Sequence, residues 1–152
     1  MLADAIYAYL HFAAIFTLIW FVAKEWTLLK AGVDTLDIVR LAKSDIGYFL
    51  AAIAVLATGL TRALAGAKGW AFYAHNSIFH TKVGLFLLVA LISIWPTRAF
   101  IRWRKAAATD PLFRPEPAEW RLAKRLVMVE LHLIALIPLA AVLMARGFGF
   151  HG

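Results

Sequence analysis

The chain has 152 residues, of which 63% are hydrophobic and 16% are charged, and its mean hydropathy is +0.77. A soluble domain of this length cannot bury so much apolar surface, so the composition excludes an ordinary soluble protein and indicates an integral membrane protein. The sequence has no cysteine, which excludes disulfides, thiolate metal sites and iron–sulfur clusters. The net charge of +7 suits contact with anionic lipid headgroups, and with no recognition motif beside it we expect no nucleic-acid partner.

Four apolar segments are long enough to cross about 30 Å of hydrocarbon as helices. A backbone in lipid must satisfy its own hydrogen bonds, so each segment is predicted to be an α-helix. The fold class is therefore predicted to be an all-α membrane bundle of four helices, in one domain. Its predicted spans are residues 5–23, 46–65, 80–97 and 126–145.

The first span contains His11, about 4–5 Å from the middle of the span by helix rise. No basic residue precedes the span, and Lys24, Glu25 and Trp26 stand where a signal peptide would need a small-residue cleavage site. We therefore expect a retained helix. A histidine in such a helix either bonds to a neighbouring helix or acts as a ligand, and the sequence leaves both readings open.

The segment before the second span is amphipathic, and Asp34 or Thr35 is predicted to cap a helix that runs into that span. Asp45 stands where this helix enters the membrane. The span also carries a face of small residues suited to close packing against another helix. These residues are Gly47, Ala51 and Gly59.

Arg62 closes the second span, and Gly66 and Gly69 are predicted to break the helix. The connector after this break is rich in aromatic residues, which is typical of a membrane interface. Its aromatic anchors are Trp70, Phe72 and Tyr73.

The third helix is predicted to be capped by Asn76 or Ser77, and Lys82 lies about one turn inside it. His75 and His80 are five residues apart across the helix start, which is a poor match to zinc-ligand spacing.

The fourth helix is predicted to begin near Ala118 and to end at Arg146, where Gly147 supplies a stop. Glu130 and His132 point in nearly opposite directions from it, so they are not a local acid–base pair. By helix rise, His132 is offset from His11 by about 10 Å along the membrane normal, too far for both to bind one iron.

Basic residues are unevenly distributed between the two sides. Twelve of the sixteen lie between spans one and two or between spans three and four. The positive-inside rule then predicts a multi-pass protein of the bacterial inner (cytoplasmic) membrane with both termini periplasmic, on the non-cytoplasmic side.

Ionisable residues inside spans are costly, so each is expected to have a partner or a function. Three cations from three helices are predicted at the outer level, an arrangement that suits a bound anionic group. They are Arg62, Lys82 and Arg146. Three acids are predicted towards the inner ends, as a buried acidic cluster on a proton or cation path. They are Glu25, Asp45 and Glu130. The alternative is that the cations extend to the interface and that neighbouring basic residues pair with the acids. Those partners would be Lys24, Lys43, Lys124 or Arg125.

A set of short motifs runs through nearly the whole chain. It comprises Leu10-His11, Asp45-Ile46-Gly47-Tyr48, Gly59-Leu60-Thr61-Arg62, Lys68-Gly69, Phe72-Tyr73, Lys82-Val83-Gly84-Leu85-Phe86, Ser93-Ile94-Trp95-Pro96-Thr97, Trp103-Arg104, Glu130-Leu131 and Met144-Ala145-Arg146-Gly147. These motifs resemble those of a family of small four-helix bacterial inner-membrane proteins catalogued as a domain of unknown function. The resemblance implies the fold and the bacterial membrane, and it implies no activity.

A more distant resemblance concerns two histidine motifs. His11 with Trp20-Phe21, and His80-Thr81-Lys82, are similar to motifs of the HemJ-type protoporphyrinogen oxidases, which are haem-binding four-helix membrane proteins. The resemblance implies a tetrapyrrole site. It leaves the oxidase activity open, because this chain has Ala8 where those proteins carry a lysine.

Three functions are therefore compared. The first is a haem b or porphyrin-binding bundle for electron transfer or porphyrin handling, with His11 on the iron and the outer cations on the carboxylates. Its remaining site residues are Trp70 and Tyr73 as a lid, and His80. The second is a non-enzymatic accessory subunit of a larger membrane complex, in which the small-residue face of the second span meets a partner helix. The third is an ion or proton transporter acting as a homo-oligomer.

Overall fold

The computed structural model describes residues 2–65 and 69–149, and the regular elements in these residues are helices. Four of them are long and apolar enough to cross a membrane. This confirms the prediction of an all-helical membrane protein with four spanning helices in contact with lipid. The elements are α1 (Leu2–Lys30), α2 (Ile38–Ala65), α3 (Gly69–Ala74), α4 (Ser77–Thr109) and α5 (Pro117–Ala145).

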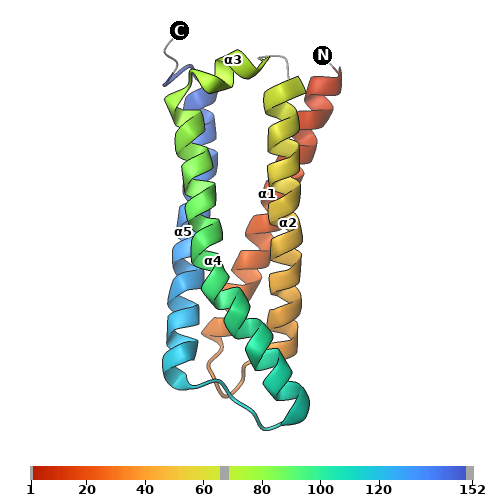
Figure 1. The fold of residues 1–152 in the computed structure, drawn as a ribbon, viewed down its shortest axis with the longest axis vertical. Coiled ribbons are helices and arrows are strands. Elements are labelled where there is room, and N and C mark those ends of the chain that lie inside the picture. The colour runs from red at the N-terminus through yellow and green to blue at the C-terminus, as the bar shows by residue number, and fades with distance from the viewer. Residues whose placement is uncertain (1, 66–68, 150–152) are drawn as a thin grey trace.

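The long helices form two hairpins, α1 with α2 and α4 with α5, which stand side by side (Figure 1). The connections 31–37 and 110–116 lie together at one end of the bundle, which we call the loop end. The short helix α3 crosses from one hairpin to the other at the opposite end, which we call the α3 end (Figure 1). Both ends of the described chain lie at the α3 end.

Close packing of α1 on α2 depends on the small residues of α2. A Cβ atom at Gly47 would lie 2.3 Å from the ring of Phe21, and one at Gly59 would lie 3.0 Å from the His11 ring. Ala51 is buried as well. The expectation that this face meets a partner subunit is therefore wrong, because α1 of the same chain already covers it.

Helix termini differ in part from the sequence predictions. Neither Asp34 nor Thr35 caps α2; the Asp37 carboxylate accepts from the Arg40 backbone N–H at 2.9 Å, while the Thr35 hydroxyl donates to the Ala31 carbonyl. The chain turns at Gly32, whose φ of +111° favours glycine, and α2 begins at Ile38.

The remaining helix boundaries follow the sequence more closely. Asn76 caps α4, its side chain accepting from two backbone N–H groups, and α5 ends at Ala145 with Gly147 at φ +88°. Gly69 is the first residue of α3 rather than a break, and Gly66, Lys68 and His151 lie outside the described residues.

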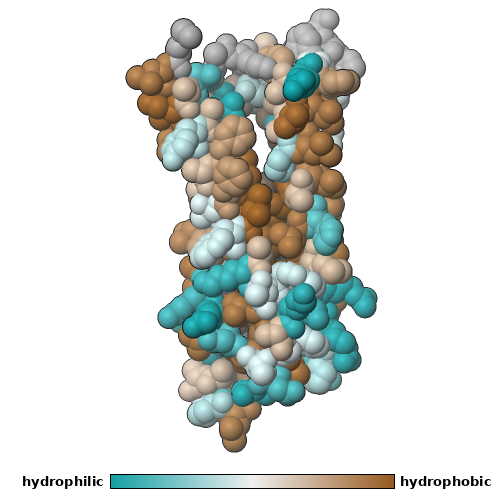
Figure 2. Space-filling view, turned by 180° about the vertical axis from the view of Figure 1, so that it is seen from behind, coloured by the Kyte–Doolittle hydropathy of each residue, from teal (hydrophilic) through white to brown (hydrophobic). Residues whose placement is uncertain are grey.

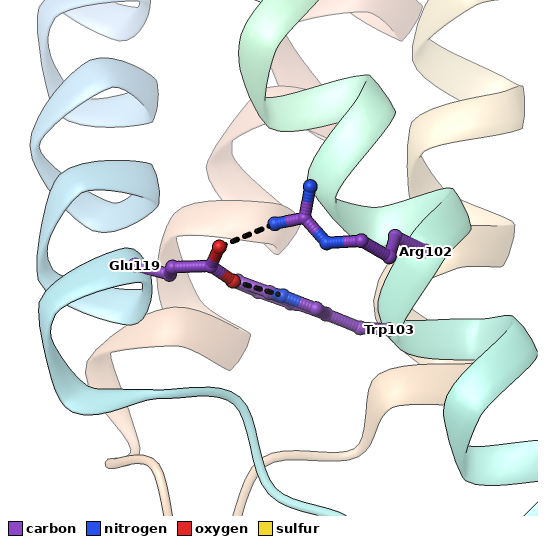
Figure 3. Close-up of polar contacts among 3 residues, drawn as sticks. All are labelled: Arg102, Trp103 and Glu119. Carbon is purple, nitrogen blue, oxygen red and sulfur yellow. Dashed lines mark hydrogen bonds and ion pairs between the residues drawn. The ribbon is translucent and has the colours of Figure 1, made fainter.

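The best-packed part of the bundle lies towards the loop end, where Phe100, Trp103 and Val127 are fully or almost fully buried. There the Glu119 carboxylate of α5 accepts from Arg102 at 2.6 Å and from the Trp103 indole N–H at 3.0 Å, which joins α5 to α4 (Figure 3). On the face seen in Figure 2, hydrophilic residues gather on the loop-end half, and hydrophobic residues dominate the half nearer α3. On this face the half nearer α3 is also hollowed between the hairpins.

Candidate functional site

Three acidic side chains from three helices are buried inside the bundle. Glu25 of α1 and Glu130 of α5 are each 1% exposed, and Asp45 of α2 is 5% exposed. They lie close enough for their charges to act on one another. We call these three residues the acid cluster.

Hydroxyl groups supply the contacts of the acid cluster. The Thr97 hydroxyl of α4 donates to Asp45 Oδ1 at 2.8 Å. The phenol of Tyr48, itself buried, hydrogen-bonds to the Glu130 carboxyl. Glu25 Oε1 and Glu130 Oε1 are buried and have no hydrogen-bond partner. The cluster is therefore only partly satisfied.

Basic residues do not neutralise the acid cluster. Within residues 2–65 and 69–149 the ion pairs join Arg40 to Asp37 and Arg102 to Glu119, and neither involves the cluster. Two cations that the sequence offered as partners stand over aromatic rings instead. They are Lys24, with its Nζ 5.4 Å from the Trp20 ring centre, and Lys124, with its Nζ 5.0 Å from that of Trp120. The alternative of locally paired acids is therefore not supported.

A groove of about 540 Å³ runs beside the acid cluster, between α2 and α4. Asp45 and Thr97 stand in its wall, and Arg104 and Lys105 line it nearer the loop end. Asp45 is thus the member of the cluster that borders an open space.

A second polar group lies at the α1–α2 contact in the half nearer α3. His11 Nδ1 is 2.9 Å from Thr58 Oγ1, and the Thr58 hydroxyl donates to the Ala54 carbonyl at 2.6 Å. Because that hydroxyl proton is committed to the carbonyl, the threonine oxygen accepts from His11 Nδ1–H. The neutral ring then keeps the lone pair of Nε2 for another partner.

Two of the three predicted outer cations face His11. The positive charges of Arg62 on α2 and Lys82 on α4 both act on its ring. Arg62 Nε is buried without a hydrogen-bond partner, and its guanidinium stands 5.9 Å from the Phe12 ring centre. Arg146 is exposed and is not among the charges that act on His11. The structure thus brings His11, Arg62 and Lys82 together and leaves Arg146 apart.

The other predicted site residues belong to α3 and its surroundings. Tyr73 is buried and packs 5.3 Å from Phe79, while Trp70 is half exposed. His80 Nε2 bonds to the Ala74 carbonyl at 2.9 Å, and His75 Nδ1 bonds to that of Ala71. These two histidines therefore bond to backbone carbonyls of α3.

His132 lies on the surface of α5 and bonds to the Met128 carbonyl within its own helix. In the part of the chain that the structure describes, no group of three or more histidine or acidic residues is arranged to hold a metal ion. A single axial histidine is a different arrangement, because a haem iron takes four of its ligands from the porphyrin.

Comparison with known proteins gives one match. The model of a family described as "Predicted membrane protein (DUF2214)" matches residues 3–149. No curated protein and no solved structure matches the chain. The likeness to HemJ-type oxidases therefore stays a hypothesis.

Proposed function

Because that match spans nearly its whole length, the chain belongs to the DUF2214 family of predicted membrane proteins, and on this premise we propose that it binds a haem b or related porphyrin between its hairpins. His11 would bind the iron, and Arg62 and Lys82 would hold the carboxylates of the porphyrin. The observation that carries the proposal is the bond from His11 to Thr58, which leaves Nε2 free on a ring faced by two cations.

The residues fit such a group by donor type. A haem-ligating histidine is neutral, binds iron through one nitrogen and donates its other N–H to a fixed acceptor, which here is the Thr58 oxygen. Carboxylates bind best where cations have unused donors, and Arg62 Nε is such a donor. Tyr73 of α3 is buried at this end of the bundle and would form part of a lid over the site.

The bound group would determine which role the site serves. A haem iron supplies one-electron redox chemistry, so an iron-loaded protein would serve electron transfer. A metal-free porphyrin would be held by its carboxylates alone, and the protein would then serve porphyrin handling. In both cases the protein positions the ring between the two hairpins.

The proposed setting is the bacterial inner membrane, with the α3 end towards the periplasm. Twelve of the sixteen basic residues lie within residues 24–43 and 98–125, the stretches between the predicted spans that include the loop-end connections, and such segments stay in the cytoplasm. A reporter enzyme that works only in the periplasm should be active when it is fused to the C-terminus. Activity from a cytoplasm-specific reporter at that position would reverse the orientation.

Haem titration of the detergent-purified protein tests the site. The unaltered protein should take up haem with a shifted Soret band, and His11→Ala should abolish that shift. Thr58→Val keeps the side-chain shape, removes the acceptor for His11 Nδ1–H, and should weaken haem affinity by about 10–100-fold. Thr61→Val is the matched control, because the Thr61 hydroxyl bonds only within α2, and it should bind as the unaltered protein does. Equal affinities for His11→Ala and the unaltered protein would refute the proposal.

A further inference from the structure

The acid cluster is distant from the proposed porphyrin site and needs its own explanation. Glu25 and His11 are fourteen residues apart on α1, which is about 21 Å along a helix. Acidic side chains that deep in a membrane bundle are expensive and usually have a function. The role of the cluster is therefore independent of whether a porphyrin binds at His11.

Every helix packed around the cluster contributes either an acid or a neutral hydroxyl. Glu25 comes from α1, Asp45 and Tyr48 from α2, and Glu130 from α5, while α4 contributes the Thr97 hydroxyl. Across residues 2–65 and 69–149, no lysine, arginine or histidine forms an ion pair with any of the three acids. The short helix α3 is at the other end of the molecule.

Three ionised carboxylates cannot share an apolar interior without a positive charge among them. A metal ion would need ligands that converge, and the described residues hold no such group. A proton needs only one carboxylate oxygen. Glu25 Oε1 and Glu130 Oε1 are buried without a hydrogen-bond partner, and a proton on either group removes a negative charge that such burial makes costly.

The groove between α2 and α4 runs from Asp45 towards the loop end, where Arg104 and Lys105 line it. Asp45 is in its wall, whereas Glu25 and Glu130 do not line it. Arg104 and Lys105, further towards the loop end, make the groove unfavourable for a hydrated metal cation. Protons can still reach Asp45 by transfer between water molecules.

We propose that the acid cluster is a proton-binding site, loaded from the aqueous phase at the loop end through Asp45. A hydronium ion gives its proton to Asp45 and leaves as water. Asp45 then passes the proton to Glu25 or Glu130 and returns to the carboxylate form. The net change is one proton bound, and no other reactant is consumed.

Infrared spectroscopy of the purified protein tests whether a proton is bound in the acid cluster. At neutral pH the protein should show the carbonyl-stretch band of a protonated carboxyl group, and Glu25→Gln or Glu130→Gln should weaken it. Glu116→Gln is the matched control, because Glu116 is exposed in the loop before α5, and it should leave the band unchanged. A wild-type protein without the band would overturn the proposal, as would a band that both cluster variants leave at full strength.

Transfer into D₂O tests the route. The carboxyl band should shift within the dead time of mixing in the wild-type protein and at least tenfold more slowly in Asp45→Asn. An unchanged exchange rate in Asp45→Asn would refute Asp45 as the point of entry. Magnesium or calcium added to the wild-type protein should leave the band intact, and its loss would identify a metal ion as the occupant and overturn the proposal without any substitution.

Discussion

Replacement of Glu119 by alanine tests how the two helices of the second hairpin are joined. Its carboxylate holds the indole N–H of Trp103, a residue that is 1% exposed, and the guanidinium of Arg102, whose side chain is 57% exposed (Figure 3). Because the two donors differ in exposure, the two hydrogen bonds should contribute differently to the free energy of unfolding. A buried donor left unpaired costs about 1–3 kcal/mol, whereas an exposed ion pair contributes about 0.2–1 kcal/mol.

We therefore expect Glu119→Ala to lower the free energy of unfolding by about 1–2 kcal/mol. This lies in the lower part of the range for an unpaired buried donor, because water can enter where the partly exposed carboxylate stood. Arg102→Gln removes only the exposed pair and should cost under about 1 kcal/mol. Glu119→Gln keeps an oxygen for Trp103 and should fall between these two values.

The assay is unfolding of the purified protein in mixed micelles, followed by circular dichroism, for the three variants in parallel. Arg40→Gln serves as the control, because its ion pair with Asp37 is more exposed than that of Arg102 and should contribute almost nothing. If Arg102→Gln destabilises as much as Glu119→Ala, the buried indole N–H is not the dominant contact and the reasoning is wrong.

The remaining predictions concern single positions in helices. Gly47→Ala should destabilise by about 1–3 kcal/mol, because its Cβ would overlap the Phe21 ring, and partial unfolding in detergent measures this. Gly84→Ala in α4 should be neutral or stabilise by about 0.5–1 kcal/mol in the same assay, since nothing lies within 4 Å of its Cβ; equal losses at the two glycines would contradict the packing. Asn76→Ala should cost about 1–2 kcal/mol and increase proteolysis near α3, because the cap bonds to two backbone N–H groups are lost; wild-type protease resistance would count against it.

The four spanning helices could be predicted from the sequence because lipid leaves a backbone few options. Long apolar segments bounded by charge or proline specify helices almost without regard to packing. The short helix α3 could not be predicted in the same way. Its six residues are too few for a hydrophobic period, and it is held in place by tertiary contacts such as the bond from His80 to Ala74.

Only the ionisable residues of the candidate sites could be predicted from the sequence, because a charge inside a membrane is energetically costly. A charge in or beside an apolar span is conspicuous, so Glu25, Asp45 and Glu130 stood out, and the structure buries all three. The hydroxyl partners Thr58 and Thr97 did not, because hydroxyl residues are common in membrane helices and their pairing depends on helix rotation.

Arg146 was predicted to belong to a site from which the structure separates it. It stands at the C-cap of α5, at the α3 end where Arg62 and Lys82 also lie, but this position does not say which way a side chain points, and the structure leaves Arg146 exposed. Tyr48 had a usable signal, since it lies three residues after Asp45 and therefore shares its face of α2.

The central claim is that a porphyrin occupies the half of the bundle nearer α3. The most direct measurement is the visible spectrum of the protein purified in detergent from cells supplied with haem precursor, recorded oxidised and after reduction with dithionite. We predict a Soret band in the purified protein, with sharpened bands on reduction if iron is bound. A colourless protein that also fails to take up added haem would contradict the claim.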